Sequence, residues 1–157
     1  MNKTTHEQFV TLAKRDLEKV VVNSGIGRIS QQANFNEKLP AIEKEFAMIV
    51  GQKPAERPAR QSIAGFKMRE GNIVGIMATL RGRRMVDFLM RVVNVVIPRM
   101  RDFRGIALKN VDKEGNLTIG VKEHIVFPEM NGEVPKVNFG IQMTLVPKLR
   151  GRVKALE

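Results

Sequence analysis

Basic side chains gather in one stretch of this sequence, and their spacing is the first sign of chemistry. From Arg57 to Arg104 the chain carries eleven lysines and arginines against three acidic residues, and so holds eight of its eleven net positive charges. Guanidinium and ammonium groups bind phosphate and displace the counterions condensed on it. A solvated surface without a partner usually mixes both signs more evenly. The stretch therefore favours a polyanionic partner, nucleic acid above all, over an acidic protein or membrane.

Within this stretch a hydroxyl and a guanidinium stand two positions apart, at Thr79 and Arg81. If Ile76–Arg81 is a strand, Thr79 and Arg81 share one face, while Ala78 and Leu80 share the other. A hydroxyl suits ribose and base edges, and a planar guanidinium suits phosphate. We therefore predict one buried face and one face open to an RNA backbone.

A second candidate is the charged segment Lys67–Asn72. Apolar runs flank it, Ile63–Phe66 before and Ile73–Leu80 after, and Gly71 is a typical turn residue. The pattern predicts a hairpin with this segment at its tip. Such a tip either probes a second RNA surface or carries charge only for solubility.

Catalytic chemistry has little support. The two histidines, His6 and His124, lie far apart in sequence, and neither has an obvious carboxylate partner nearby. The chain has no cysteine, which excludes thiolate zinc sites and thiol nucleophiles. Ser24–Gly27 lacks the lysine and the spaced glycines of a phosphate loop, and we interpret it as an ordinary connection between a strand and a helix. We expect no enzyme, no metal and no cofactor.

Helical periodicity predicts the elements that position these residues. Asn36 is a candidate cap for the second helix and Gly51 its stop, and Pro98 should end the third. The three expected helices are Thr5–Arg15, Asn36–Val50 and Gly82–Ile97. The apolar face of the third would hold Met85, Phe88, Leu89, Val92, Val93 and Val96.

Strands alternate with these helices irregularly. Besides the hairpin arms we expect strands at Leu17–Asn23 and Val137–Val146, a second hairpin over Asn110–Gly120, and at best an edge strand over Gln52–Arg60. This order favours the α+β class: an antiparallel sheet with helices packed mainly on one face, in a single domain of residues 1–157 with a protruding hairpin. An N-terminal helix within residues 1–16 and a basic tail, residues 146–157, complete the expected organisation.

The chain has no apolar run of the roughly 18 residues that a membrane span needs, and no apolar signal core at its start. We therefore expect a cytoplasmic protein, with no membrane partner. Two other classes stay open. A peripheral membrane protein would use Gly82–Arg99 as a basic amphipathic helix, which liposome flotation would detect. A nucleic-acid enzyme would show activity in a nuclease assay.

Five motifs in the same order resemble a single family. They are Gly51–Pro54, Ser62–Gly71, Thr79–Met85, Pro98–Gly105 and Lys122–Glu129. The family they resemble is bacterial-type large-subunit ribosomal protein five, which binds 5S ribosomal RNA. The resemblance covers about Glu18–Leu145. The chain departs from the family pattern in its shorter N-terminal segment and in its basic tail, Val146–Lys154.

The resemblance implies a structural protein of the large ribosomal subunit, in cytoplasmic or organellar ribosomes. Such a protein binds 5S and large-subunit rRNA, helps form the central protuberance, and meets small-subunit protein thirteen. The hairpin Ser62–Gly75 would reach the peptidyl-site tRNA. The implied rRNA-binding residues are Asn23, Gln52, Thr79 and Arg81. The implied hairpin residues near tRNA are Ser62, Phe66, Lys67, Arg69 and Gly71.

Overall fold

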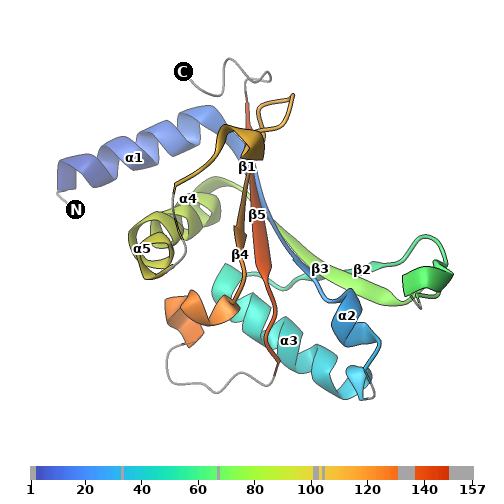
Figure 1. Cartoon of the computed structure of the whole chain (residues 1–157). Coiled ribbons are helices and arrows are strands. Elements are labelled where there is room, and N and C mark those ends of the chain that lie inside the picture. The colour runs from blue at the N-terminus through green and yellow to red at the C-terminus, as the bar shows by residue number, and fades with distance from the viewer. Residues whose placement is uncertain are drawn as a thin grey trace. The chain divides into compact units, whose positions relative to one another are not determined.

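The computed structural model describes residues 3–32, 34–66, 68–100, 103, 105–130 and 137–148. Five strands form one sheet in the order β2-β3-β1-β5-β4, accompanied by helices (Figure 1). The α+β class with an antiparallel sheet is confirmed. The strands are β1 (Leu17–Gly25), β2 (Ala55–Pro58), β3 (Ile73–Leu80), β4 (Leu117–Val121) and β5 (Ile141–Pro147). The α-helices are α1 (Lys3–Asp16), α2 (Gly27–Ser30), α3 (Phe35–Val50), α4 (Gly82–Arg91) and α5 (Ile97–Arg99).

The chain divides into two compact units, each of which is described by itself. Unit 1 comprises Met1–Val21, Thr79–Ile119 and Met143–Glu157, and unit 2 comprises Val22–Ala78 and Gly120–Gln142. Strands β1, β3 and β5 each contribute residues to both units. Unit 1 therefore holds Thr79 and Arg81, whereas Asn23, Gln52 and the hairpin belong to unit 2.

In unit 1 the helix that begins at Gly82 runs past its expected end. A π-helical turn, η2 (Val92–Val96), follows α4, and α5 then carries the chain through Pro98. The Met100 N–H donates to the Val96 and Ile97 carbonyls at 3.1 Å each. Pro98 stands at the start of α5, directly after the π turn. The prediction that Pro98 ends the helix at Ile97 is wrong.

The π turn also changes which side chains are buried. Val93, expected on the apolar face, is 43% exposed. A π turn places about one more residue per turn than an α-helix and so rotates the following side chains. Val86, which we had not placed on that face, is buried. The buried set of this helix is Met85, Val86, Phe88, Leu89, Val92 and Val96.

In unit 2 the long helix α3 follows its predicted periodicity. Ile42, Phe46 and Ile49 are fully buried. Gly51 ends the helix with a left-handed φ of 77°, and its N–H donates to the Ala47 carbonyl at 2.8 Å, as predicted. The cap at the other end is Asn34, with φ 67°, and not Asn36. Its side chain makes no capping hydrogen bond.

The hairpin of unit 2 pairs different segments from those expected. Strand β2 is an edge strand, as predicted, and it is β2 that pairs antiparallel with β3. The register runs from Ala55 opposite Met77 to Pro58 opposite Ile73, and it shifts between Arg57 and Pro58. In Figure 1 the loop between the two strands extends well beyond their ends.

The hairpin tip therefore lies earlier than predicted. Ile63 and Met68 exchange backbone hydrogen bonds of 3.0 and 3.2 Å around a 3-10 turn, η1 (Ala64–Phe66). A strand at Ile63–Phe66 and a tip at 67–72 are both wrong, because the β2–β3 ladder continues through Ala59 and leaves this segment to form the loop. The Gly71 turn is confirmed: its φ is 87°, and its N–H donates to the Ala59 carbonyl at 3.0 Å.

The last two strands agree with the sequence in outline. The bend before β4 forms at Asp112, whose Oδ1 accepts hydrogen bonds from the N–H groups of Glu114 and Asn116 at 2.9 and 2.8 Å. The arm opposite β4 is a single bridge between Val111 and Leu117. Strand β5 begins at Ile141, later than the predicted Val137.

Candidate nucleic-acid interface

The alternation predicted at the end of β3 is present. Ala78 and Leu80 are buried, whereas Thr79 between them is half-buried and on the opposite face. Within the described part of the chain, the Thr79 hydroxyl makes no side-chain hydrogen bond. It is available to a partner on the face away from the core.

Arg81 follows directly as the N-cap of α4, with extended backbone angles of −137° and 161°. Its guanidinium lies 3.2 Å from Glu18 Oε1, with 57% of its side chain exposed. The hydrogen bond from Arg81 is the main cause that lowers the pKa of Glu18, and the charge of Lys19 adds to it. Glu18 is therefore ionised at neutral pH and competes with phosphate for Arg81. The sequence pattern gave no sign of this partner.

Other hydroxyls lie on the non-core face of unit 1. Thr118 in β4 and Thr144 in β5 have their Oγ1 atoms 3.2 Å apart, and they alternate with buried Ile119 and Met143. The same alternation in sequence would have identified them, had these short strands been bounded correctly. They extend the polar character of this face.

Unit 2 contributes Asn23 and Gln52. Asn23 alternates with buried Val22 and Ser24 along β1. Its Oδ1 is buried and accepts no hydrogen bond from the described residues. Leaving such an acceptor unpaired costs about 1–3 kcal/mol. Gln52 is half-buried just after the end of α3, and its side chain has no partner within the described ranges.

Some of the hairpin residues hold the hairpin together, and others expose their side chains to solvent. The Ser62 Oγ accepts a hydrogen bond from the Glu70 N–H at 2.9 Å and so ties the two arms together. Arg69 is exposed, and Gly71 supplies the left-handed turn. Lys67 and the side chain of Phe66 lie outside the described residues.

His124 is not the isolated residue that the sequence suggested. It is fully buried in unit 2 and stacks on Phe139 with ring centroids 4.0 Å apart. Its Nε2 lies 3.2 Å from Glu45 Oε2, and its Nδ1 accepts the Phe139 N–H at 3.4 Å. The expectation that no carboxylate lies nearby is wrong, because α3 brings Glu45 to it. The enclosed contacts indicate a role in packing. The side chain of His6 lies outside the description.

Two alternative uses find no support. The apolar face of α4 is buried, and Val93 in the following π turn is the large apolar side chain of Gly82–Arg99 that is exposed, which leaves little apolar surface to insert into a membrane interface. In the described parts of the chain, no helix combines the length and the apolar character needed to cross a bilayer. Nor do these parts bring three or more histidines and carboxylates together as metal ligands.

Comparison with known proteins agrees with this geometry. The family model for ribosomal protein L5 matches residues 13–69, and the model for the C-terminus of the same ribosomal family matches residues 73–154. The large ribosomal subunit protein uL5 of Halothermothrix orenii is 40% identical over 159 residues, which cover 100% of this chain and 85% of that protein. Its counterpart from Desulfatibacillum aliphaticivorans is 48% identical over 131 residues, covering 83% and 71%. The chain therefore belongs to the ribosomal protein L5 family and is a structural, non-enzymatic constituent of the large ribosomal subunit.

Proposed function

We propose that the chain binds 5S rRNA and holds it against large-subunit rRNA in the central protuberance of a cytoplasmic ribosome. In the same proposal the hairpin contacts the peptidyl-site tRNA, and the protein meets small-subunit protein thirteen. The observation that carries the rRNA proposal is the end of β3, where the free Thr79 hydroxyl precedes the exposed Arg81 guanidinium. A net charge of +11 supplies the long-range attraction.

The proposed mechanism is placement of folded RNA and involves no bond making. Arg81 takes a phosphate, and Thr79 takes a phosphate or ribose oxygen. Asn23, which is half-buried on the face of β1 away from the core, presents its carboxamide to a ribose 2′-hydroxyl. These few polar contacts set the register, while the basic side chains supply most of the affinity.

Removing the guanidinium tests this role directly. We expect Arg81→Ala to weaken 5S rRNA binding by about 1–3 kcal/mol, the range of a charge-assisted hydrogen bond. Thr79→Ala should cost less, since it removes a neutral hydrogen bond. Filter binding or calorimetry with purified 5S rRNA measures both. Unchanged affinity in Arg81→Ala would contradict the assignment.

The complementary variant, expected to change the affinity in the opposite direction, is Glu18→Gln. Glu18 holds Arg81 in the free protein, so its neutral analogue should strengthen RNA binding. The same logic sets the pH dependence. Because the pKa of Glu18 is lowered, its carboxylate stays charged until the pH falls below the ordinary range for glutamate. Protonation there should release Arg81 and raise affinity in the natural chain, but not in Glu18→Gln.

The hairpin should act as a separate functional element. Residues 60–65 and 69–72 are all exposed, so the hairpin end adds little to the core. Replacing residues 63–68 with a short glycine-containing turn retains the Ser62–Glu70 tie and the Gly71 turn. We expect folding and 5S affinity to stay nearly unchanged. In reassembled ribosomes, peptidyl-site tRNA should dissociate faster. Loss of 5S affinity with an unaltered tRNA off-rate would show that the hairpin binds 5S rRNA instead.

A further inference from the structure

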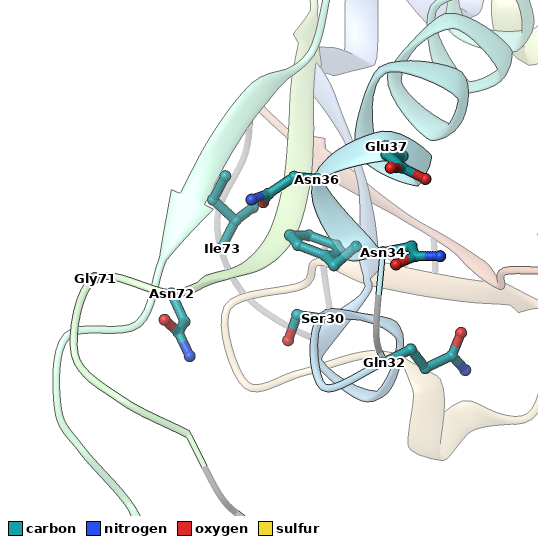
Figure 2. Close-up of a pocket in the computed structure, with 9 residues that line it drawn as sticks. Ser30, Gln32, Asn34, Asn36, Glu37, Gly71, Asn72 and Ile73 are labelled. Atoms are coloured by element: carbon teal, nitrogen blue, oxygen red, sulfur yellow. The ribbon is translucent and has the colours of Figure 1, made fainter.

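A polar cavity of about 570 Å³ lies beside the hairpin in unit 2. One wall is formed by Ser30, Gln32 and residues 34–37, and the other by the returning hairpin arm, Gly71–Ile73. Figure 2 shows the two walls facing each other, with the Asn36 side chain directed toward Ile73. None of the rRNA-binding residues implied by the family resemblance lines this cavity.

The lining is rich in carboxamides. Gln32, Asn34 and Asn36 come from one wall and Asn72 from the other. A carboxamide presents one donor group and one acceptor side by side. This pairing matches the edge of a nucleobase, because Asn and Gln bond the N6 and N7 positions of adenine together.

Among the described residues, most of these carboxamides have no side-chain hydrogen-bond partner. The Asn36 and Asn72 side chains make no hydrogen bond to any described residue, and the Asn34 side chain does not cap its helix. The Gln32 Oε1 accepts a hydrogen bond from Lys38 Nζ at 3.0 Å, which turns the Gln32 amide so that its N–H groups remain as donors. In Figure 2 the Asn36 side chain is directed toward the hairpin arm, whereas the Gln32 and Asn34 side chains extend away from that arm. Asn36 and Asn72 are therefore the carboxamides that the two walls offer to one ligand.

The charge of the lining favours a base over a phosphate. The described residues that line the cavity include no lysine or arginine and one carboxylate, Glu37, and the nearby Lys38 ammonium is taken up by the Gln32 Oε1 at 3.0 Å. A carboxylate repels phosphate but accepts a hydrogen bond from an exocyclic amino group. Phe35, half-buried in the same lining, adds an aromatic surface. Aromatic and amide side chains together are the usual means of holding an unstacked base of single-stranded RNA.

Backbone hydrogen bonds hold the hairpin wall of the cavity in place. The Asn72 carbonyl accepts the Ala59 N–H at 2.8 Å, and the Asn72 N–H donates to the Arg69 carbonyl at 3.2 Å. Exposed Arg69 lies close by in sequence and can neutralise the backbone of a strand whose base enters the cavity. Arg69 thus offers a phosphate site on the same hairpin arm as Asn72.

We propose that this carboxamide cavity holds one unpaired nucleotide of RNA, with adenine as the preferred base. The inference rests on the proposed RNA-binding function and adds to it a specific base-reading site, distinct from the backbone contacts at Arg81. A duplex presents no free base, so the ligand is a loop, a bulge or a strand end.

The test uses the whole chain, labelled with nitrogen-15, and a single-stranded RNA of six adenosines. The side-chain amide signals of Asn36 and Asn72 should shift on titration, and should shift little with six uridines or with an abasic strand of equal length. Asn36→Ala should lower the affinity for the adenosine strand about tenfold, the order expected for one amide–base pair. The matched control is Gln8→Ala, an exposed carboxamide on α1, which should bind as the natural chain does.

Equal shifts at these amides with the abasic strand would overturn the proposal, because they would indicate backbone binding. Equal shifts with uridine would overturn the preference for adenine. Parallel titration with 5S rRNA separates the two proposals. If 5S rRNA binds while the adenosine strand leaves these amides unmoved, only the cavity proposal fails. If the adenosine strand shifts these amides while 5S rRNA does not bind, the proposed function fails and the cavity site stands.

Discussion

The affinity of the chain for 5S rRNA should fall by about two to four orders of magnitude as monovalent salt rises from about 50 to about 200 mM. The reason is the basic stretch Arg57–Arg104, most of whose described basic side chains reach solvent. The exposed ones are Arg57, Arg60, Arg69, Arg81, Arg83, Arg84 and Arg99. Arg83 lies 3.7 Å from Asp87, but the two side chains are 91% and 63% exposed, so this pair contributes little.

If about five to eight of these side chains meet phosphates, the counterions they release set the slope of affinity against salt. The measurement is a binding titration at several salt concentrations with magnesium held constant, so that the RNA fold does not change. Arg81→Ala should reduce the slope by about one phosphate contact. An affinity that hardly varies over the range would show that base and shape contacts, and not charge, carry the interaction.

Leu80→Ala should destabilise the fold by about 2–5 kcal/mol without a specific effect on RNA binding. Leu80 is fully buried in unit 1, at the end of β3, so truncation removes apolar contacts and leaves a cavity. Urea unfolding, read as a lower midpoint at constant slope, measures the loss. The RNA affinity of the fraction that remains folded should equal that of the natural chain.

Thr79→Ala is the matched control, one residue away and with the same replacement. Its half-buried side chain faces away from the core, so it should change stability by less than about 1 kcal/mol while weakening RNA binding. If Thr79→Ala unfolded the protein and Leu80→Ala left its stability unchanged, the assignment of the two strand faces would be reversed.

Local patterns in the sequence predicted the elements that short-range physics determines. The spacing of Ile42, Phe46 and Ile49 gave α3, and Gly51 gave its left-handed end. The period of two residues along a strand predicted which face of β3 around Thr79 is buried and which is open. In each case the residues that specify the structure lie within one or two turns of each other, so the pattern is visible without the fold.

The errors arose where contacts join distant segments. Strand β3 pairs with β2 across the hairpin loop, and α3 places Glu45 beside His124. Neither pairing has a local signature. The π turn has none either, since the apolar spacing around Val93 fits an ordinary helix equally well. The π turn becomes visible only in the backbone of the structure.

The same limit applied to the candidate site. Thr79 and Arg81 could be chosen because a strand repeats every two residues. Glu18, which controls the charge beside Arg81, could not, because it lies on another strand. Likewise, no spacing in the sequence links Asn36 with Asn72, which face one cavity from two separate segments.

Strand β2 has a consequence for the chain before it meets any RNA. It stands at the edge of the sheet, where unpaired N–H and C=O groups are a template for pairing with another copy. The strand is four residues long, exposed throughout, charged at Glu56 and Arg57, and ended by Pro58, which has no N–H to donate. The register shift between Arg57 and Pro58 further interrupts the edge. These features oppose pairing of β2 with the same strand of another copy, and so reduce aggregation through this edge before the chain binds RNA.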